Sequence, residues 1–268
     1  RKQGNRLRVT AQLINLEDGF HLWSERYDRD MDDIFAIQDE IALAITEKLK
    51  VTLLEDDHAI VTKTHTKNTE AYELYLKGRF YLSRRGNFIL TGMENFKKAI
   101  SIDPDFALAW SGYADAISVG TVYGFLPGKK VMREIKEALE TAIRLDNTLS
   151  EPYCSLGSYY TLFEKNWAEA KRFFIKGLEL NPNYAQGRSW YGMIYFAWAE
   201  GNFVEAEKQG RLAIKAEPLS AIDHADLSWT YHTANKFDEA LSVAKTGIEL
   251  DANSFLSHRL AGLSYIGL

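Results

Sequence analysis

The stretch Lys98–Phe106, KAISIDPDF, decides the fold because variants of it recur along the chain. They read KGLELNPNY at Lys176–Tyr184, IKAEPLS at Ile214–Ser220 and, more loosely, TGIELDANS at Thr246–Ser254. Proline lacks the amide hydrogen that a helix interior needs, and its ring clashes with the preceding turn. Each string is therefore predicted to contain the end of one helix and the connection to the next.

Two further patterns recur between these connections. A small residue lies four positions before a larger apolar one, as in Ala170 and Phe174. Apolar residues three and four apart form a stripe on one face of a helix, and each unit of about 35 residues carries two stripes. Each unit is predicted to be a helical hairpin, in which the small residues let the two helices approach closely. The remaining pattern is Leu156-Gly157-x-x-Tyr160, Tyr191-Gly192-x-x-Tyr195, Leu227-Ser228-x-x-Tyr231 and Ala261-Gly262-x-x-Tyr265.

This order of patterns resembles the tetratricopeptide repeat (TPR), which reads W-x₂-L-G-x₂-Y…A-x₃-F…P over 34 residues. The resemblance covers roughly Ala71–Leu268. It implies a mainly α fold: a TPR-type α-α superhelix, or solenoid, preceded by a small α+β segment. The expected units are 71–106, 107–149, 150–184, 185–220, 221–254 and a partial unit 255–268.

The first fifty residues have a different periodicity. Arg6–Leu13 alternates polar and apolar residues, the Leu16–Gly19 segment supplies an Asp-Gly turn signal, and Phe20–Arg26 resumes the alternation. After Asp32-Asp33, a plausible helix cap, apolar residues follow at helical spacing to about Lys50. The sequence therefore predicts a β-hairpin followed by a helix.

The segment Gly4–Leu53 is similar to the carboxy-terminal half of the TolB-like domain of bacterial multidomain proteins. Its most specific parts are WSERYD at Trp23–Asp28 and IFAIQDE at Ile34–Glu40. The resemblance implies a TolB-like part at 1–53, a linker at 54–70 and the TPR array at 71–268. In that family, the domain commonly links an upstream class III adenylate cyclase or DNA-binding winged-helix domain to downstream repeats.

Composition limits the classes of function. The 268 residues are 46% hydrophobic and 26% charged, which is typical of a globular chain, and the net charge is −5 without a dense run of Lys or Arg. We therefore expect no nucleic acid partner. An apolar run long enough to cross a bilayer is absent from the sequence. The single cysteine, Cys154, fits a reducing compartment, so we expect a cytoplasmic location, with the periplasm left open because the chain begins at Arg1 without a leader.

Residues typical of catalysis or metal binding do not form a recognisable set. GFLPGKK, within an extended hairpin turn expected at Ser118–Glu134, has only three residues between Gly124 and Gly128 and no Ser or Thr after Lys129, unlike a phosphate loop. The six histidines contain no pair four apart, and Cys154 has no neighbouring histidine. We expect no catalytic residue, no metal and no cofactor, and predict that the chain is not an enzyme.

A binding surface is the remaining expectation. The first helix of each unit should line the concave side of the superhelix, although any single residue on it could instead pack between units. This set is weakly charged and lacks the Lys, Arg and Asn cluster with which related TPR proteins bind acidic chaperone tails, so a mixed apolar peptide or an intramolecular segment is expected. The inward-facing candidates are Tyr72, Tyr75, Arg79, Ser111, Asp115, Cys154, Ser158, Thr161, Ser189, Met193, Phe196, Ala225, Trp229 and His232.

Together these features predict a non-catalytic protein–protein interaction scaffold, or a regulatory module, within a larger bacterial signalling protein. The alternative is the carboxy-terminal regulatory part of a class III adenylate cyclase. An intramolecular contact with a preceding domain is compatible with both.

Overall fold

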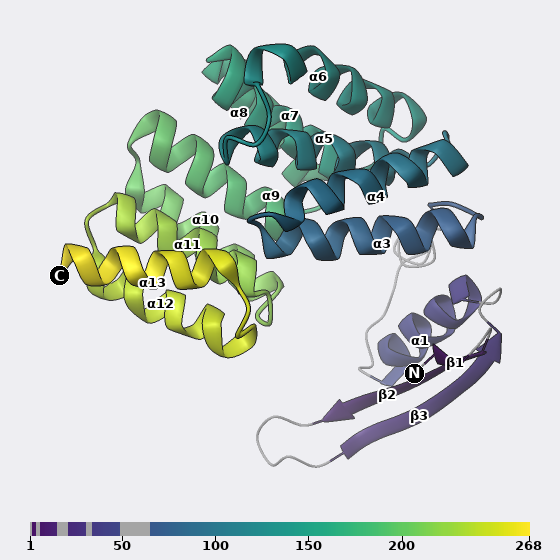
Figure 1. Cartoon of the computed structure of the whole chain (residues 1–268). Helices are drawn as coiled ribbons and strands as arrows, with labels where there is room; N and C mark the ends of the chain where they lie inside the picture. The colour runs from purple at the N-terminus through teal and green to yellow at the C-terminus, as the bar shows by residue number, and fades with distance from the viewer. Residues whose placement is uncertain (1, 4–5, 15–20, 31–33, 49–64) are drawn as a thin grey trace. The chain divides into compact units, whose positions relative to one another are not determined.

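The computed structural model describes residues 2–3, 6–14, 21–30, 34–48 and 65–268 (Figure 1). The chain divides into two compact units, Arg1–Thr69 and Glu70–Leu268. The first contains an antiparallel sheet in the order β1 (Lys2–Gln3), β2 (Arg6–Ile14) and β3 (His21–Asp30), followed by helix α1 (Ile34–Lys48).

The first unit has the β-hairpin and helix that the alternating sequence predicts. Thr10 pairs with Arg26 near the middle of the β2–β3 ladder, and Tyr27 and Ile37 are buried. Strand β1 was not predicted, because two residues are too few to show an alternation. The predicted Leu16–Gly19 turn, the Asp32-Asp33 cap and most of the expected linker lie outside the described residues.

The second unit is a succession of antiparallel helical hairpins, stacked in chain order (Figure 1). Two first helices, α7 and α9, continue as the wider π-helices η2 and η3. The pairs are α3 (Thr69–Arg84) with α4 (Phe88–Ile102), α5 (Ala107–Val122) with α6 (Gly128–Leu145), α7 (Glu151–Tyr159) and η2 (Tyr160–Glu164) with α8 (Trp167–Leu180), α9 (Ala185–Trp190) and η3 (Tyr191–Glu200) with α10 (Phe203–Ala216), and α11 (Ala221–Thr233) with α12 (Phe237–Leu250); α13 (Phe255–Gly267) follows them.

The recurring small residues lie where helices pack most closely. A Cβ atom added at Gly78 would come within 2.7 Å of the Phe96 ring, and one added at Gly112 within 2.5 Å of the same ring. Phe96 is fully buried between the first helices of two successive hairpins. The pattern of small residue and aromatic residue is thus the packing contact that joins neighbouring units.

The recurring prolines follow the helix ends as predicted. Helices α4, α8 and α10 each end two residues before Pro104, Pro182 or Pro218. A side chain from the next helix often donates a hydrogen bond to the carbonyl oxygen at this position: Trp110 Nε1 to Pro104 (2.8 Å), Arg188 Nε to Pro182 (2.6 Å) and His258 Nε2 to Ala252 (2.9 Å). This contact gives His258 a structural role in closing the connection.

The extended turn expected at Ser118–Glu134 is shorter than predicted. Helix α5 continues to Val122 and α6 begins at Gly128, so only residues 123–127 connect them. Val131 and Met132 pack against the core, and Thr121 Oγ1 donates to the Ile117 carbonyl oxygen. Most of the glycine-rich segment is therefore helical because tertiary packing outweighs its weak helix propensity.

The second unit curves until its early and late helices meet. The end of α3 and the turn after it lie beside the connection from α12 to α13 and the start of α13: Arg84 Nη2 is 4.0 Å from the Asp251 carboxylate, and a Cβ atom on Gly86 would be 3.4 Å from the Phe255 ring. The Phe255 ring is also 6.3 Å from the Tyr123 ring at the end of α5. These contacts join segments that are far apart in the sequence.

Two glycines at equivalent repeat positions make a matched pair for testing the close helix packing. A Cβ atom at Gly192 would be 2.8 Å from the Ala206 carbonyl oxygen, whereas a Cβ atom at Gly262 would meet nothing within 4 Å. Gly192→Ala is expected to lower the free energy of unfolding by about 1–3 kcal/mol, because backbone atoms cannot rotate away. Gly262→Ala should leave it unchanged or raise it by up to about 1 kcal/mol. Urea unfolding followed by circular dichroism measures both; equal effects would contradict the packing account.

Candidate functional site

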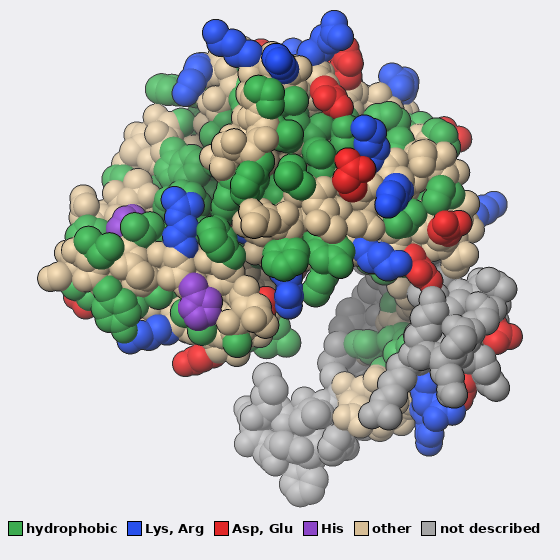
Figure 2. Space-filling view, in the orientation of Figure 1, with side chains coloured by type: hydrophobic (Ala, Val, Ile, Leu, Met, Phe, Trp, Pro, Cys, Tyr) green, Lys and Arg blue, Asp and Glu red, His purple; other side chains and the backbone are tan. Residues whose placement is uncertain are grey.

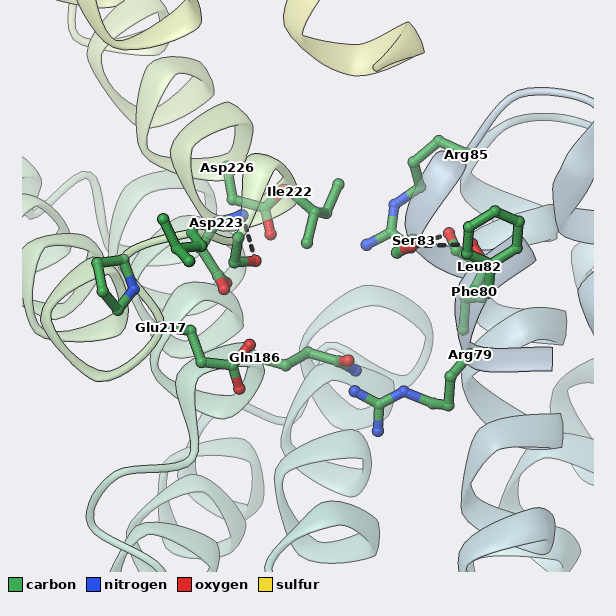
Figure 3. A pocket seen from close by; sticks show the side chains of 13 residues that line it. Arg79, Phe80, Leu82, Ser83, Arg85, Gln186, Glu217, Ile222, Asp223 and Asp226 are labelled. Carbon is green, nitrogen blue, oxygen red and sulfur yellow. Dashed lines mark hydrogen bonds between the residues drawn. The ribbon is translucent and has the colours of Figure 1, made fainter. Parts of the chain in front are cut away.

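The inner side of the superhelix contains a cavity of about 580 Å³, here called the inner cavity (Figure 3). Helices α3 and α11 and the connection from α10 to α11 contribute most of its wall, and α9 contributes one residue. Its residues are Arg79, Phe80, Leu82, Ser83, Arg85, Gln186, Glu217, Pro218, Leu219, Ser220, Ile222, Asp223 and Asp226.

One wall of the inner cavity is cationic. Arg79 and Arg85 extend from the α3 side toward the gap (Figure 3). Arg85 follows the last residue of α3 with a left-handed backbone (φ 60°), and its Nη1 donates to the Leu82 carbonyl oxygen at 2.7 Å. Arg85 is only 6% exposed, and no carboxylate of the described residues lies within 4 Å of its guanidinium. Arg79 Nη1 makes a long hydrogen bond, 3.4 Å, to the Tyr75 hydroxyl.

The opposite wall is acidic. Asp223 accepts a hydrogen bond of 2.7 Å from Ser189 Oγ. Asp226 is 3% exposed, and its carboxylate accepts no hydrogen bond from any described residue. Burial raises the pKa of Asp226 to about 7, although the charge of Arg85 acts in the other direction. Burial also raises the pKa of Glu217, which precedes α11.

Asp115 is a buried carboxylate of α5 that is hydrogen-bonded to Gln186, one of the residues that line the inner cavity. Its carboxylate accepts hydrogen bonds from Ser155 Oγ at 2.5 Å and from Gln186 Nε2 at 3.1 Å. These partners belong to the next two hairpins, so one buried carboxylate connects three units. Burial raises the pKa of Asp115 to about 6, because desolvation exceeds the opposing effects of the hydrogen bonds and of Arg79.

A second, small cavity of about 40 Å³ shares Arg85 and Asp226 with the inner cavity. Its wall is mainly apolar. The rings of Trp198 and Trp229 meet edge to face at 5.3 Å, and the Arg259 guanidinium lies 5.3 Å from the Trp229 ring. The two cavities together present opposite charges beside an aromatic surface, an arrangement suited to binding and without an arranged nucleophile or base.

Other kinds of site find no support in the part of the chain that is described. No three His, Cys, Asp or Glu side chains of these residues gather as metal ligands would. Among the described helices, none has both the length and the hydropathy needed to cross a membrane. On the face drawn in Figure 2, Lys and Arg side chains are interspersed with Asp and Glu, and hydrophobic side chains lie between them.

Comparison with solved structures shows which proteins share this architecture. Human IFIT1, in a dimer with m7Gppp-AAAA, has a TM-score of 0.57 and 16% identity, covering 85% of this chain and 50% of that one. A thermophilic TPR protein of Thermus thermophilus has a TM-score of 0.54 and 17% identity, with coverages of 72% and 98%. The APC/C hetero-tetramer Cut9–Hcn1 gives a TM-score of 0.50, 20% identity and coverages of 88% and 48%. The fold is that of the tetratricopeptide-repeat proteins.

Sequence comparison adds one relative. No protein-family model matches the chain. A protein of Rhizobium meliloti (strain 1021), named putative adenylate cyclase 3, is 36% identical over 112 residues. This match covers 41% of the chain but spans only 19% of the length of that protein.

Four of the predicted inward-facing residues line one of the two cavities. Arg79 lines the inner cavity, and Ser158, Met193 and Trp229 line the small one. Tyr72 stacks on Tyr75 (ring centroids 6.3 Å apart), and the His232 ring faces Phe237 of the partner helix at 5.3 Å. The binding role of the set stays a prediction, although most of its members are buried: Tyr75, Ser111, Asp115, Cys154, Ser158, Thr161, Ser189, Met193, Phe196 and Ala225.

Cys154 packs in the array rather than facing a cavity. It is fully buried, and a Cβ atom added at Gly177 or Gly187 would come within 2.5 or 2.7 Å of its Sγ atom. Burial raises the pKa of its thiol to about 12. A thiol in this environment is protonated and inert as a nucleophile at neutral pH.

Sequence reasoning missed the charges that define the inner cavity. Arg85, Glu217, Asp223 and Asp226 line it beside the uncharged Gln186, so the inner side is more strongly charged than predicted. A signal was present in α11, where two aspartates interrupt a helix that is otherwise suited to burial. Polar residues on such a helix indicate either a satisfied interior network or a binding surface.

Proposed function

We propose that the TPR array is a non-catalytic module that binds a protein or peptide segment on its inner side, within a larger bacterial signalling protein. The observation that supports it most is the inner cavity, whose wall combines residues from three parts of the array and carries Arg85 and Asp226, both almost fully buried and not ion-paired with each other within 4 Å. A protein segment suits this site better than a nucleic acid, because the chain has a net charge of −5 and the cavity itself has an acidic wall.

A second candidate function is the regulatory part of an adenylate cyclase. It is favoured by the partial match to the protein named putative adenylate cyclase 3. In this alternative, residues 1–53 would be part of a TolB-like domain, residues 54–70 a linker, and the array 71–268 would bind a segment of the same polypeptide. The two candidates differ in whether the same polypeptide carries a cyclase catalytic domain that the array regulates.

Site-specific photo-crosslinking tests the proposal and separates the candidates. Phe80→p-benzoylphenylalanine places the probe at the cavity on a side chain that is 52% exposed, and Trp167→p-benzoylphenylalanine, at a position 48% exposed on the second helix α8, is the matched control. The full-length protein, irradiated in lysate of its source, is expected to form adducts only with the Phe80 probe, and mass spectrometry then identifies the attached peptide. An attached segment from a cyclase catalytic domain of the same polypeptide would favour the cyclase-regulator candidate. No adduct, or the same adducts from both positions, would contradict binding at the inner side.

A further inference from the structure

The inner cavity holds opposite charges on facing walls without joining them. Arg79 and Arg85 reach from α3, while Asp223, Asp226 and Glu217 lie across the gap (Figure 3). Among the described residues, no ion pair within 4 Å connects the two walls. The charges are thus close enough to influence one another, as the effect of Arg85 on the Asp226 carboxyl shows, yet too far apart to pair directly.

Separate elements keep the walls apart. Arg85 Nη1 donates a hydrogen bond to the carbonyl oxygen of Leu82, near the end of α3. The Asp223 carboxylate accepts a hydrogen bond from Ser189 Oγ of α9. These hydrogen bonds hold one atom of each side chain on its own side of the gap. Asp226 has no such bond and is 3% exposed, and the buried hydroxyl of Tyr123, which with Asp226 lines the small cavity, also lacks a hydrogen-bond partner.

Buried charged groups without partners are unfavourable, so their retention requires a compensating contact. A ligand with a negative group at one end and a positive group at the other would supply partners to both walls. Between them the wall is apolar, with Leu82 and Ile222, and at the cavity Phe80 and Leu219 are 52% and 80% exposed. A volume of about 580 Å³ is within the range of sites for short peptide-sized ligands, and the exposed apolar residues offer contacts for flanking residues of a longer chain.

We propose that the inner cavity binds a peptide segment of mixed charge, with an acidic side chain at Arg79 and Arg85 and a basic side chain at Asp223 and Asp226. This inference rests on the proposed function, because it specifies the chemistry of the segment that the inner side binds. The arginines can form paired hydrogen bonds with a carboxylate, and the aspartates can accept from an ammonium or guanidinium group.

Affinity selection with defined peptides tests this chemistry. Four pools of blocked peptides of about eight residues share small and apolar residues and contain one Glu and one Lys, one Glu, one Lys, or neither. The protein is expected to retain the mixed-charge pool about tenfold more than any other pool. Asp226→Asn should reduce its retention to that of the Glu pool, and Arg79→Gln or Arg85→Gln to that of the Lys pool. Two separate arginine variants are used in case one of them fails to fold, and circular dichroism checks that each variant is folded.

Matched controls lie outside the cavity. Arg133→Gln removes an exposed arginine of α6, and Asp238→Asn an exposed aspartate of α12, and both should retain the mixed-charge pool as the unchanged protein does. A second readout is pH. Binding of the mixed-charge pool should be up to about tenfold tighter at pH 8 than at pH 6, since a basic side chain needs the ionised Asp226, and Asp226→Asn should remove that difference. The charged or titratable groups near Asp226 are Arg85 after α3, Tyr123 after α5 and Asp223 on α11 itself.

The outcomes separate the inference from the proposed function. Retention of single-charge or neutral pools as strongly as the mixed-charge pool, with adducts still formed at Phe80, would overturn the mixed-charge inference and leave binding at the inner side intact. Retention of no pool, together with no adduct at Phe80, would overturn both. Retention of the mixed-charge pool that the Asp226 and arginine variants leave unchanged would place the binding elsewhere and also overturn the inference.

Discussion

Phe174→Ala is expected to lower the free energy of unfolding by about 3–5 kcal/mol, because it removes a large side chain from a closely packed interior. Phe174 is fully buried, and a Cβ atom on Gly157 would come within 2.6 Å of its ring. Its ring also stacks on Tyr191 of the next hairpin, with centroids 4.8 Å apart. The cavity left behind would therefore lie between units as well as inside one.

Urea unfolding followed by circular dichroism measures this loss, and Ile175→Ala is the control. Ile175 is the next residue of α8 and is 43% exposed, so its truncation should cost well under half of the Phe174 effect. The slope of the free energy against urea should stay the same in both variants if the array unfolds as one unit. A Phe174→Ala loss no larger than that of Ile175→Ala would show that this aromatic does not join the hairpins.

The protein is expected to be more stable at pH 5 than at pH 8, by roughly 2–4 kcal/mol. Burial raises the pKa of Asp115 from 3.8 to about 6 and that of Asp226 from 3.8 to about 7. Between the ordinary aspartate pKa of 3.8 and the raised pKa in the folded protein, the folded protein binds more protons than the unfolded chain. The free energy of unfolding therefore falls as pH rises through the window from about 4 to 7. Carboxyls with lowered pKa, such as Glu205 beside Gln209, have the opposite effect only at lower pH.

Thermal unfolding at several pH values checks this dependence. The double variant Asp115→Asn, Asp226→Asn should have a much flatter profile between pH 5 and pH 8, because its two amides do not ionise. Asp238→Asn, an exposed change in the first turn of α12, should keep the profile of the unchanged protein. A stability that rises from pH 5 to pH 8 in the unchanged protein would contradict the assignment.

The hairpins could be predicted because their signals are local. Apolar stripes, small residues at close contacts and prolines such as Pro104 and Pro182 lie within each unit, and the helices end where they indicate. The long turn around Gly124 was misjudged for the opposite reason. Its glycines and proline indicate a loop locally, whereas contacts of residues such as Val131 with the core keep most of it helical.

The inner side could be predicted only in part because it depends on how units are rotated against one another. Met193 and Phe196, which counting at 3.6 residues per turn assigns to the inner side, both lie in η3, where the wider π-helical winding changes the angle between successive residues. Met193 lines the small cavity. Phe196 packs on Tyr191, with ring centroids 4.5 Å apart, and its binding role stays a prediction. The distance between Arg85 and Asp226 follows from rotations summed over several hairpins, for which a single sequence has no local signal.

The contact between the turn after α3 and the start of α13 affects where unfolding of the array begins. A linear array of repeats opens from its ends, because a terminal repeat has a neighbour on one side only. Here Arg84 and Gly86 meet Asp251 and Phe255, so the first hairpin has a second neighbour. Within the second unit, local unfolding at α3 therefore also removes contacts of the α12–α13 region. Any opening of the inner side that moves the end of α3 away from the start of α13 must first break the contacts of Arg84 and Gly86 with Asp251 and Phe255.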